Sequence, residues 1–190
     1  MNDLPEPFIG VRMHKNKTAT GRRSSMSAKK AAIYFAFGRD KQAQQDGQQR
    51  GEWWGENGRV HTHEDVMTWA KQEALKHRYT FQAILSVPHA ELNPEQFCQA
   101  MAQSDDIQQW RLIVHDDTNH CHAHVLFFRN KRLGKRSFLR WQTAVRQELS
   151  RLEQQSLQPQ TPESEEEQQI EITLPAKPSP VSWQEAGLTW

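Results

Sequence analysis

Four of the nine histidines in this 190-residue chain fall between His115 and His124. Within that stretch His120, His122 and His124 stand at every second position, which in an extended strand puts their side chains on one face. Neighbours on one face of a strand lie roughly 6.5–7 Å apart, and imidazoles that lean together from such positions can share one metal ion at about 2.0–2.2 Å per ligand. His115 ends the preceding predicted strand, and a short turn brings the chain back beside it. The spacing therefore predicts three imidazoles around one cation, with coordination positions left open as in catalytic sites.

An alternating histidine strand can also be a solvated polar face. Four histidines within ten residues, with Asp116 and Asp117 between them, favour the metal site instead. The pair His61 and His63 sits at a predicted helix start without a third ligand nearby, so we expect it to be structural. Surface or structural roles are also expected for the isolated histidines, which are His14, His77 and His89.

The elements that must position these residues follow from hydrophobic periodicity, helix caps and chain breakers. Strands are predicted at 8–14, 79–87, 110–115 and 120–129. Helices are predicted at 27–37, 62–77, 93–103 and 139–155. Residues 39–58 are rich in glutamine and glycine and are predicted to form a long mobile loop. The order of these elements describes an α+β fold with a mainly antiparallel central sheet and flanking helices.

Charge divides the chain into two parts. Residues 1–150 hold 22 Lys and Arg against 16 Asp and Glu, whereas residues 151–190 hold two against seven. A basic body indicates a polyanionic partner. We expect one domain over residues 1–155 and a partly disordered acidic tail, rich in Gln, Pro and Ser, over residues 156–190. Within the tail, residues 170–174 could add an edge strand and 182–190 a short helix.

Composition excludes several classes of protein. The mean hydropathy of −0.89 and the absence of a run of roughly 18–20 apolar residues exclude an integral membrane protein, so no membrane insertion is expected. Cys98 and Cys121 are the only cysteines, which excludes a disulfide scaffold and a four-cysteine zinc module. A reducing, cytoplasmic location fits this cysteine usage.

The stretch from His115 to His124 resembles the metal motif of relaxases, the HUH-superfamily DNA strand transferases of plasmid mobilisation and conjugation. The family pattern, His-x-Asp-x-x-His-x-His-x-His followed by apolar residues, is matched throughout. Cys121 stands where many members carry proline, but it faces away from the predicted metal. The resemblance implies metal ligation by the first and the last two histidines, which are His115, His122 and His124.

The resemblance also implies roles for two other residues of the motif. Asp117 would orient or polarise a ligand imidazole, as outer carboxylates do in metal sites. His120 would be an auxiliary catalytic residue near the metal or the DNA. Mg²⁺ or Mn²⁺ are the usual cellular options for the metal, and Zn²⁺ also suits three imidazoles.

The family's nucleophile is a tyrosine on an N-terminal helix after the first strand. The segment from Lys29 to Tyr34 looks like that helix, and residues 81–96 are similar to the family's central strand and following helix. Tyr34 is therefore the expected nucleophile, although its helix position also suits packing with Phe35. Tyr79 opens a predicted strand, where an aromatic residue ordinarily packs.

The implied function is that of a DNA relaxase in a bacterial cytoplasm. Such an enzyme nicks one strand at the transfer origin of a plasmid or mobile element by metal-assisted tyrosine transesterification. The products are a 5′-phosphotyrosine and a free 3′-hydroxyl, and because the linkage preserves the bond energy the ends can be rejoined. Expected partners are single-stranded DNA at the origin and relaxosome accessory or coupling proteins.

Two basic clusters lie next to the tyrosine helix and the histidine strand in sequence, and such clusters neutralise phosphates in a salt-dependent manner. The predicted DNA-binding residues are Arg22, Arg23, Lys29, Lys30, Arg129, Lys131, Arg132, Lys135 and Arg136. Trp53, Trp54 and Trp69 could stack unpaired bases or could pack within the fold.

Other functions fit parts of the pattern. Residues 120–126 match the His-φ-His-φ-His-φ-φ motif of histidine-triad nucleotide hydrolases, which use no metal, but His115 and Asp117 have no role there. A non-catalytic single-stranded-DNA-binding accessory protein of replication or mobilisation would suit the small size and the acidic tail. A rolling-circle replication initiator or a transposase would use similar chemistry, although the His-x-Asp pattern and the N-terminal place of Tyr34 favour a relaxase.

Overall fold

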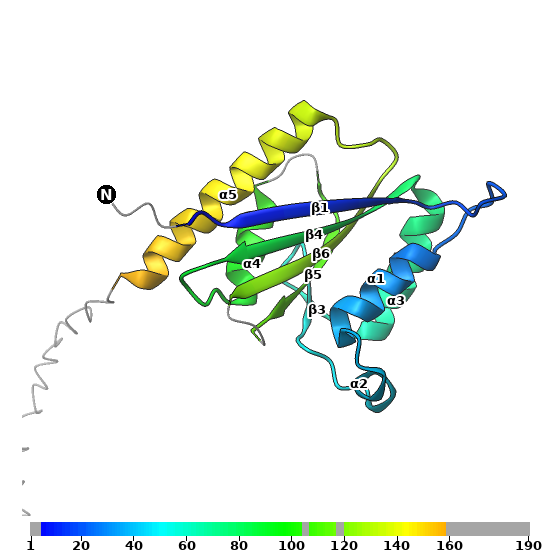
Figure 1. Ribbon diagram of the computed structural model, residues 1–190, viewed down its shortest axis with the longest axis horizontal. Helices are drawn as coiled ribbons and strands as arrows, with labels where there is room; N and C mark the ends of the chain where they lie inside the picture. The colour runs from blue at the N-terminus through cyan, green and yellow to red at the C-terminus, as the bar shows by residue number, and fades with distance from the viewer. Residues whose placement is uncertain (1–4, 104–106, 117–119, 159–190) are drawn as a thin grey trace, which may run out of the picture. The chain divides into compact units, whose positions relative to one another are not determined.

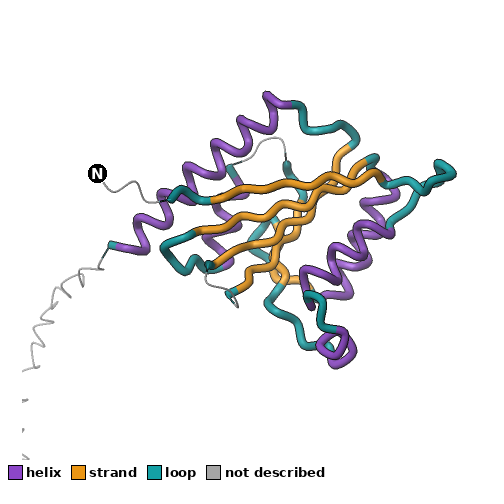
Figure 2. The backbone as a smooth tube through the Cα atoms, in the orientation of Figure 1, coloured by secondary structure: helices purple, strands orange, loops and turns teal. Residues whose placement is uncertain are grey.

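The computed structural model describes residues 5–103, 107–116 and 120–158. Within them six strands form one sheet in the order β1-β4-β6-β5-β2-β3, and every neighbouring pair is antiparallel. Figures 1 and 2 show this sheet with helices on both sides, which confirms the predicted α+β fold. The strands are β1 (Phe8–Lys15), β2 (Trp53–Gly55), β3 (Val60–His61), β4 (Tyr79–Val87), β5 (Trp110–His115) and β6 (Cys121–Arg129).

In the described part of the chain five helices accompany the sheet: α1 (Met26–Phe37), α2 (Lys41–Asp46), α3 (His63–Lys76), α4 (Pro94–Ala102) and α5 (Lys135–Leu157). Two of them begin with capping boxes that the sequence indicates. In α3 the Thr62 side chain accepts from the Asp65 N–H, and in α4 the Asn93 side chain accepts from the Gln96 N–H. α1 ends at Gly38, whose φ of 65° is a conformation that favours glycine.

Each face of the sheet has its own core. Strand alternation sends Ala123, Val125 and Phe127 of β6 toward α4 and α5, where they meet Trp141, Val145, Leu149 and Leu152. The opposite face of β6 carries His122, His124 and Leu126 toward α1 and α3. Figure 1 shows α1 and α3 together on one side of the sheet and α4 and α5 on the other. The histidine side of β6 is therefore covered by the N-terminal helices.

The prediction of a long mobile loop over residues 39–58 is wrong. The Asp40 carboxylate accepts from two backbone N–H groups and starts α2, and Gly47 ends it in the left-handed conformation. Trp53 then pairs with Ile113 of β5 and is completely buried in the core under α1 and α3. Burial of this large ring orders the segment as a sheet strand, a long-range contact that glutamine-rich composition hides.

Other differences are small. α5 begins at Lys135, directly after Gly134 and one turn before the predicted start. In this added turn Phe138 packs against Trp141 with ring centroids 6.0 Å apart. β6 begins at Cys121 rather than His120. The predicted tail elements at 170–174 and 182–190 lie outside the described residues. Among the described helices, none has the length and apolar character needed to cross a membrane.

Candidate metal centre and active site

Three histidines from β5 and β6 meet at one end of the sheet. His115 and His122 are directly opposite each other in the antiparallel register, and His124 follows two residues along β6. The pairwise ring-centroid distances are 5.1, 4.9 and 5.2 Å, and one ring nitrogen from each residue lies within 4.8 Å of the others. His115 and His122 are buried and His124 is half-buried. We call this cluster the histidine triad.

Backbone carbonyls determine which ring nitrogens of the histidine triad can ligate. His115 Nε2 lies 2.8 Å from the carbonyl oxygen of Phe35, and His122 Nδ1 lies 3.1 Å from that of His120. A carbonyl only accepts, so each of these nitrogens carries the proton and the other nitrogen of each ring keeps its lone pair. Metal-ligating histidines use this arrangement, since the second hydrogen bond fixes ring and tautomer. The donor set therefore fits a divalent cation.

Phe35 of α1 contacts two members of the triad. Its carbonyl oxygen accepts from His115, and its ring stacks on the His124 imidazole with centroids 4.5 Å apart and an interplanar angle of 18°. The ring is 2% exposed and also packs near Trp53. Phe35 thus ties α1 to both strands of the site. Sequence reasoning assigned Phe35 only to packing, since a backbone carbonyl leaves no signal in the residue pattern.

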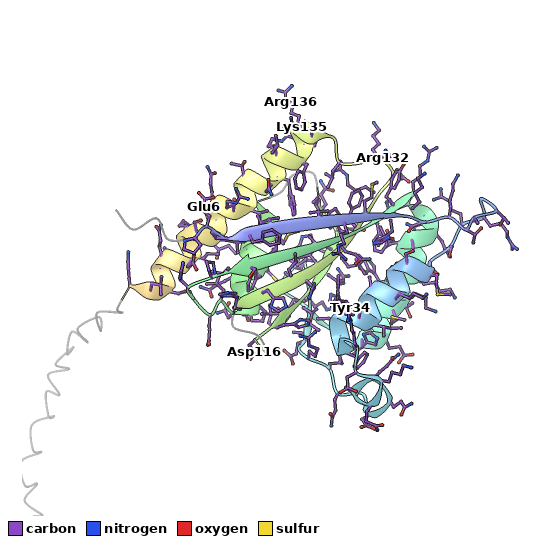
Figure 3. The ribbon with its side chains drawn as sticks, in the orientation of Figure 1. Glu6, Tyr34, Asp116, Arg132, Lys135 and Arg136 are labelled. Atoms are coloured by element: carbon purple, nitrogen blue, oxygen red, sulfur yellow. The ribbon has the colours of Figure 1, made fainter. Side chains whose placement is uncertain are left out.

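Tyr34 precedes Phe35 and lies at the edge of the triad. Its ring centroid is 6.3 Å from that of His124, and the residue is 44% exposed. Figure 3 shows Tyr34 projecting from α1. Tyr34 and His124 also line one groove of about 430 Å³ that continues over β1 and β4.

Tyr79 lies elsewhere. It belongs to the face of the sheet that packs under α4 and α5, and it pairs in register with Arg129. Arg129 is five residues along β6 from His124, which corresponds to roughly 17 Å of strand. Of the two tyrosines, only Tyr34 borders the triad.

Asp117 and His120 are the other two residues of the histidine motif to which the sequence assigns a role. Asp117 lies outside the described residues. His120 is exposed at the start of β6, and it lines a cavity of about 200 Å³ together with Asp116 and Glu91. The side chain of His120 is not a member of the triad, although its backbone carbonyl holds His122.

Cys121 faces away from the triad, as its strand position predicts. Its thiol donates to the Leu92 carbonyl at 3.3 Å in the core under α4 and α5. Burial raises the pKa of the Cys121 thiol, which disfavours the thiolate that a metal would need.

The predicted DNA-binding residues form two sets. Lys29 and Lys30 are on α1, and Lys30 is exposed one turn before Tyr34. All the others gather around the far end of the sheet or the start of α5. Figure 3 shows Arg132, Lys135 and Arg136 there, apart from Tyr34. The members of this far set are Arg22, Arg23, Arg129, Lys131, Arg132, Lys135 and Arg136.

Sheet register explains why two separate basic runs of sequence converge. Lys15 at the end of β1 pairs with Tyr79, and Tyr79 pairs with Arg129 at the end of β6. The Arg23 guanidinium donates to the His77 carbonyl at 2.8 Å, which fastens the loop after β1 to this end of the sheet. We call this region, which includes Lys15, Arg23 and Arg129, the basic end. Helix α1 runs from the basic end to the triad.

Of the three tryptophans between residues 53 and 69, Trp53 is too deeply buried to stack on DNA, whereas Trp54 and Trp69 are half-buried. Trp53 has no exposed surface. Trp54 is half-buried against the core under α4 and α5. The Trp69 ring packs against Phe128 with centroids 5.1 Å apart.

Comparison with known proteins identifies the family. The sequence model of the MobA/VirD2-like relaxase nuclease domain matches residues 39–156, more than half of the chain. The matched segment includes β5, β6 and all three histidines of the triad. The chain belongs to the MobA/VirD2-like relaxase family. No curated protein and no solved structure matches it.

As a member of this family the chain is a relaxase nuclease domain, whose general activity is DNA nicking. Relaxase domains bind single-stranded DNA and use divalent metals. The matched segment starts at residue 39, so β1 and α1 with Tyr34 precede it. The histidine-triad hydrolase alternative loses support, since His115 is an integral part of the cluster.

Proposed function

We propose that this relaxase cuts one DNA strand by attack of the Tyr34 hydroxyl on a phosphodiester held at the histidine triad. The observation that carries the proposal is the 6.3 Å between the ring centroids of Tyr34 and His124, on a helix whose next residue contacts two triad members. The exposed position of Tyr34 supports it further, because a DNA strand can approach an exposed residue from solvent.

The reaction is a transesterification. The bond between Tyr34 Oη and phosphorus forms while the bond from phosphorus to the 3′ oxygen breaks, and the number of phosphoester bonds stays the same. The phenol proton leaves to solvent, and the departing 3′ oxygen takes up a proton. The products are a 5′-phosphotyrosine and a free 3′-hydroxyl, and the reverse reaction rejoins the strand.

The three imidazoles would hold a divalent cation, Mg²⁺ or Mn²⁺ in the cell with Zn²⁺ as a further option. Such an ion supplies charge neutralisation at the non-bridging phosphate oxygens. The chain's own contribution is orientation: Phe35 holds His115 and His124, and the His120 carbonyl holds His122. We propose Asp117 and His120 as auxiliary residues of the site, as the family motif implies.

The DNA strand would run along α1 between the triad and the basic end. Lys30, exposed one helical turn from Tyr34, would contact the phosphate next to the cut, with Lys29 beside it. Arg22, Arg23 and the positive residues at the start of α5 would contact the DNA farther away. We propose single-stranded DNA at a transfer origin as the substrate, with residues 1–155 as the catalytic domain and the acidic tail as a contact for accessory or coupling proteins.

A nicking assay tests the proposal. A labelled single strand carrying the transfer origin of the element that encodes this relaxase is incubated with the protein in Mn²⁺ and in chelator. We expect a cleaved product and a DNA–protein adduct of reduced gel mobility with Mn²⁺, and neither in chelator. Binding without cleavage in any divalent ion would contradict the proposal and favour the accessory-protein alternative.

Two variants sharpen this assay. Tyr34→Phe removes only the hydroxyl, and it should abolish the adduct while leaving DNA affinity unchanged. Tyr79→Phe removes the same atom from the opposite face of the sheet and should leave the adduct at the level of the unmodified protein. Equal adduct formation by both variants would exclude Tyr34 as the nucleophile.

A further inference from the structure

The groove that Tyr34 and His124 line also includes residues of β1 and β4 that have no part in the proposed cutting reaction. It lies between α1 and the strands β1 and β4, with a volume of about 430 Å³. That volume lies within the range of pockets that hold small organic molecules, about 300–1,000 Å³. Besides Tyr34 and His124, its lining includes Phe8, Arg12 and Gln82. The groove is thus continuous with the proposed cutting site.

The backbone at Gly10 makes room for an aromatic ring on the groove side of β1. A Cβ at Gly10 would lie 3.0 Å from the Phe8 ring and 3.2 Å from Ile84, both too close for an ordinary contact. Glycine therefore allows the Phe8 ring to fold over its own strand. The Phe8 side chain is nevertheless 59% exposed. An exposed aromatic ring at a groove next to a phosphate site is suited to stacking on an unpaired base.

Polar groups complete the groove at its other end. Arg12 and Gln82 are cross-strand partners in the β1–β4 register. Arg12 is exposed, and it has no ion-pair partner among the residues that the structure describes. Its guanidinium is therefore available for a phosphate, and the Gln82 amide offers a donor and an acceptor to a base edge.

Strand spacing sets the scale of the groove. His124, Ile84 and Gly10 are consecutive partners across β6, β4 and β1. Two strand spacings separate His124 from Gly10, which is about 9.5–10 Å. A phosphate at the triad and an adjoining nucleotide over β1 can therefore belong to the same DNA strand.

We propose that this groove is a subsite for one unpaired nucleotide next to the cut phosphate. Phe8 stacks on the base, Arg12 binds the phosphate on the far side of that nucleotide, and Gln82 hydrogen-bonds to the base edge. The inference rests on the proposed function, because the groove shares Tyr34 and His124 with the cutting site.

The test separates base contacts from backbone contacts in equilibrium binding without any cleavage. Two fluorescent probes are compared by anisotropy: a thymidine oligonucleotide of about twelve residues, within the usual site sizes for single strands, and an abasic strand of the same length. Phe8→Ala should weaken binding of the thymidine strand at least about fivefold and leave the abasic strand unaffected. Arg12→Gln should weaken binding of both probes.

Matched variants control for charge and for strand integrity. Met13→Ala shortens an exposed side chain on the opposite face of β1, and Lys71→Gln removes one positive charge from α3; neither should change either affinity. Gly10→Val would displace the Phe8 ring and fill the groove, so it should reproduce the loss seen with Phe8→Ala. Thermal unfolding of each variant establishes that it is folded.

The inference is overturned if Phe8→Ala and Met13→Ala bind the thymidine strand equally well, or if Phe8→Ala weakens the abasic strand as much. The result is independent of the cutting reaction. Tyr34→Phe should keep the full difference between the two probes, so a relaxase that fails to cut can still have this subsite. Conversely, a cutting enzyme without a base-dependent effect of Phe8 would refute the subsite alone.

Discussion

The variant Phe35→Leu tests whether the Phe35 ring positions the histidine triad for metal binding, apart from its contribution to the stability of the fold. Leucine keeps an apolar side chain and the backbone carbonyl that accepts from His115, but it removes the ring that stacks on His124 at 4.5 Å. A stacked aromatic pair contributes about 0.5–1.5 kcal/mol beyond its buried area. If that energy holds the His124 imidazole in its ligating orientation, its loss weakens metal affinity about 2- to 13-fold. The smaller side chain also lowers the free energy of unfolding by about 1–2 kcal/mol.

Phe37→Leu is the matched control for this prediction. Phe37 is buried in the same core and on the same helix, but its ring contacts His63 rather than the triad. Both variants should lose similar stability in metal-free thermal unfolding. Isothermal titration with Mn²⁺ should show weaker binding for Phe35→Leu only. Equal Mn²⁺ affinities for the two variants would refute the positioning role of the Phe35 ring.

A half-buried histidine, two buried cysteines and one exposed arginine offer three further tests. Burial lowers the pKa of His63 from its ordinary value of 6.5, so at pH values below about 6.5 the unfolded chain binds more protons than the folded chain. The free energy of unfolding should therefore fall as the pH falls below about 6.5, and urea denaturation should show a smaller fall for His63→Gln. A pH-independent difference between the two proteins would contradict this account. Burial raises the pKa of Cys98 to about 12 and also raises that of Cys121, so a thiol reagent at about pH 8 should label neither cysteine until the protein unfolds. Prompt labelling of the folded protein would contradict the burial of these two thiols. Arg132→Gln should reduce the slope of log affinity against log salt for single-stranded DNA by about 0.7 if it removes one phosphate contact, and an unchanged slope would exclude that contact.

Much of the fold could be predicted because its signals are local. β4 and β5 have the bounds that alternation and flanking breakers indicate, and α3 and α4 begin at the capping residues that the sequence contains. The alternation of β6 correctly predicted that His122 and His124 share a face opposite Cys121. Each of these features depends on residues within one turn or one strand.

The features that could not be predicted depend on long-range contacts. β2 exists because Trp53 pairs with Ile113, sixty residues away, and is buried under α1. The hydrogen bond from His115 to the Phe35 carbonyl joins residues eighty positions apart. The groove at Phe8 depends on which part of the sheet α1 leaves uncovered. Such contacts have no periodic or compositional signal in a single sequence.

We propose that Tyr34 becomes joined to DNA at a cation held by three imidazoles. The most direct measurement is protease digestion of the DNA–protein adduct formed with Mn²⁺, followed by tandem mass spectrometry of the peptide that carries the nucleotide. We expect a nucleotide joined through its 5′-phosphate to Tyr34, and loss of the adduct when His124 is replaced by alanine. A nucleotide on Tyr79 or on a histidine, or an undiminished adduct in His124→Ala, would contradict it.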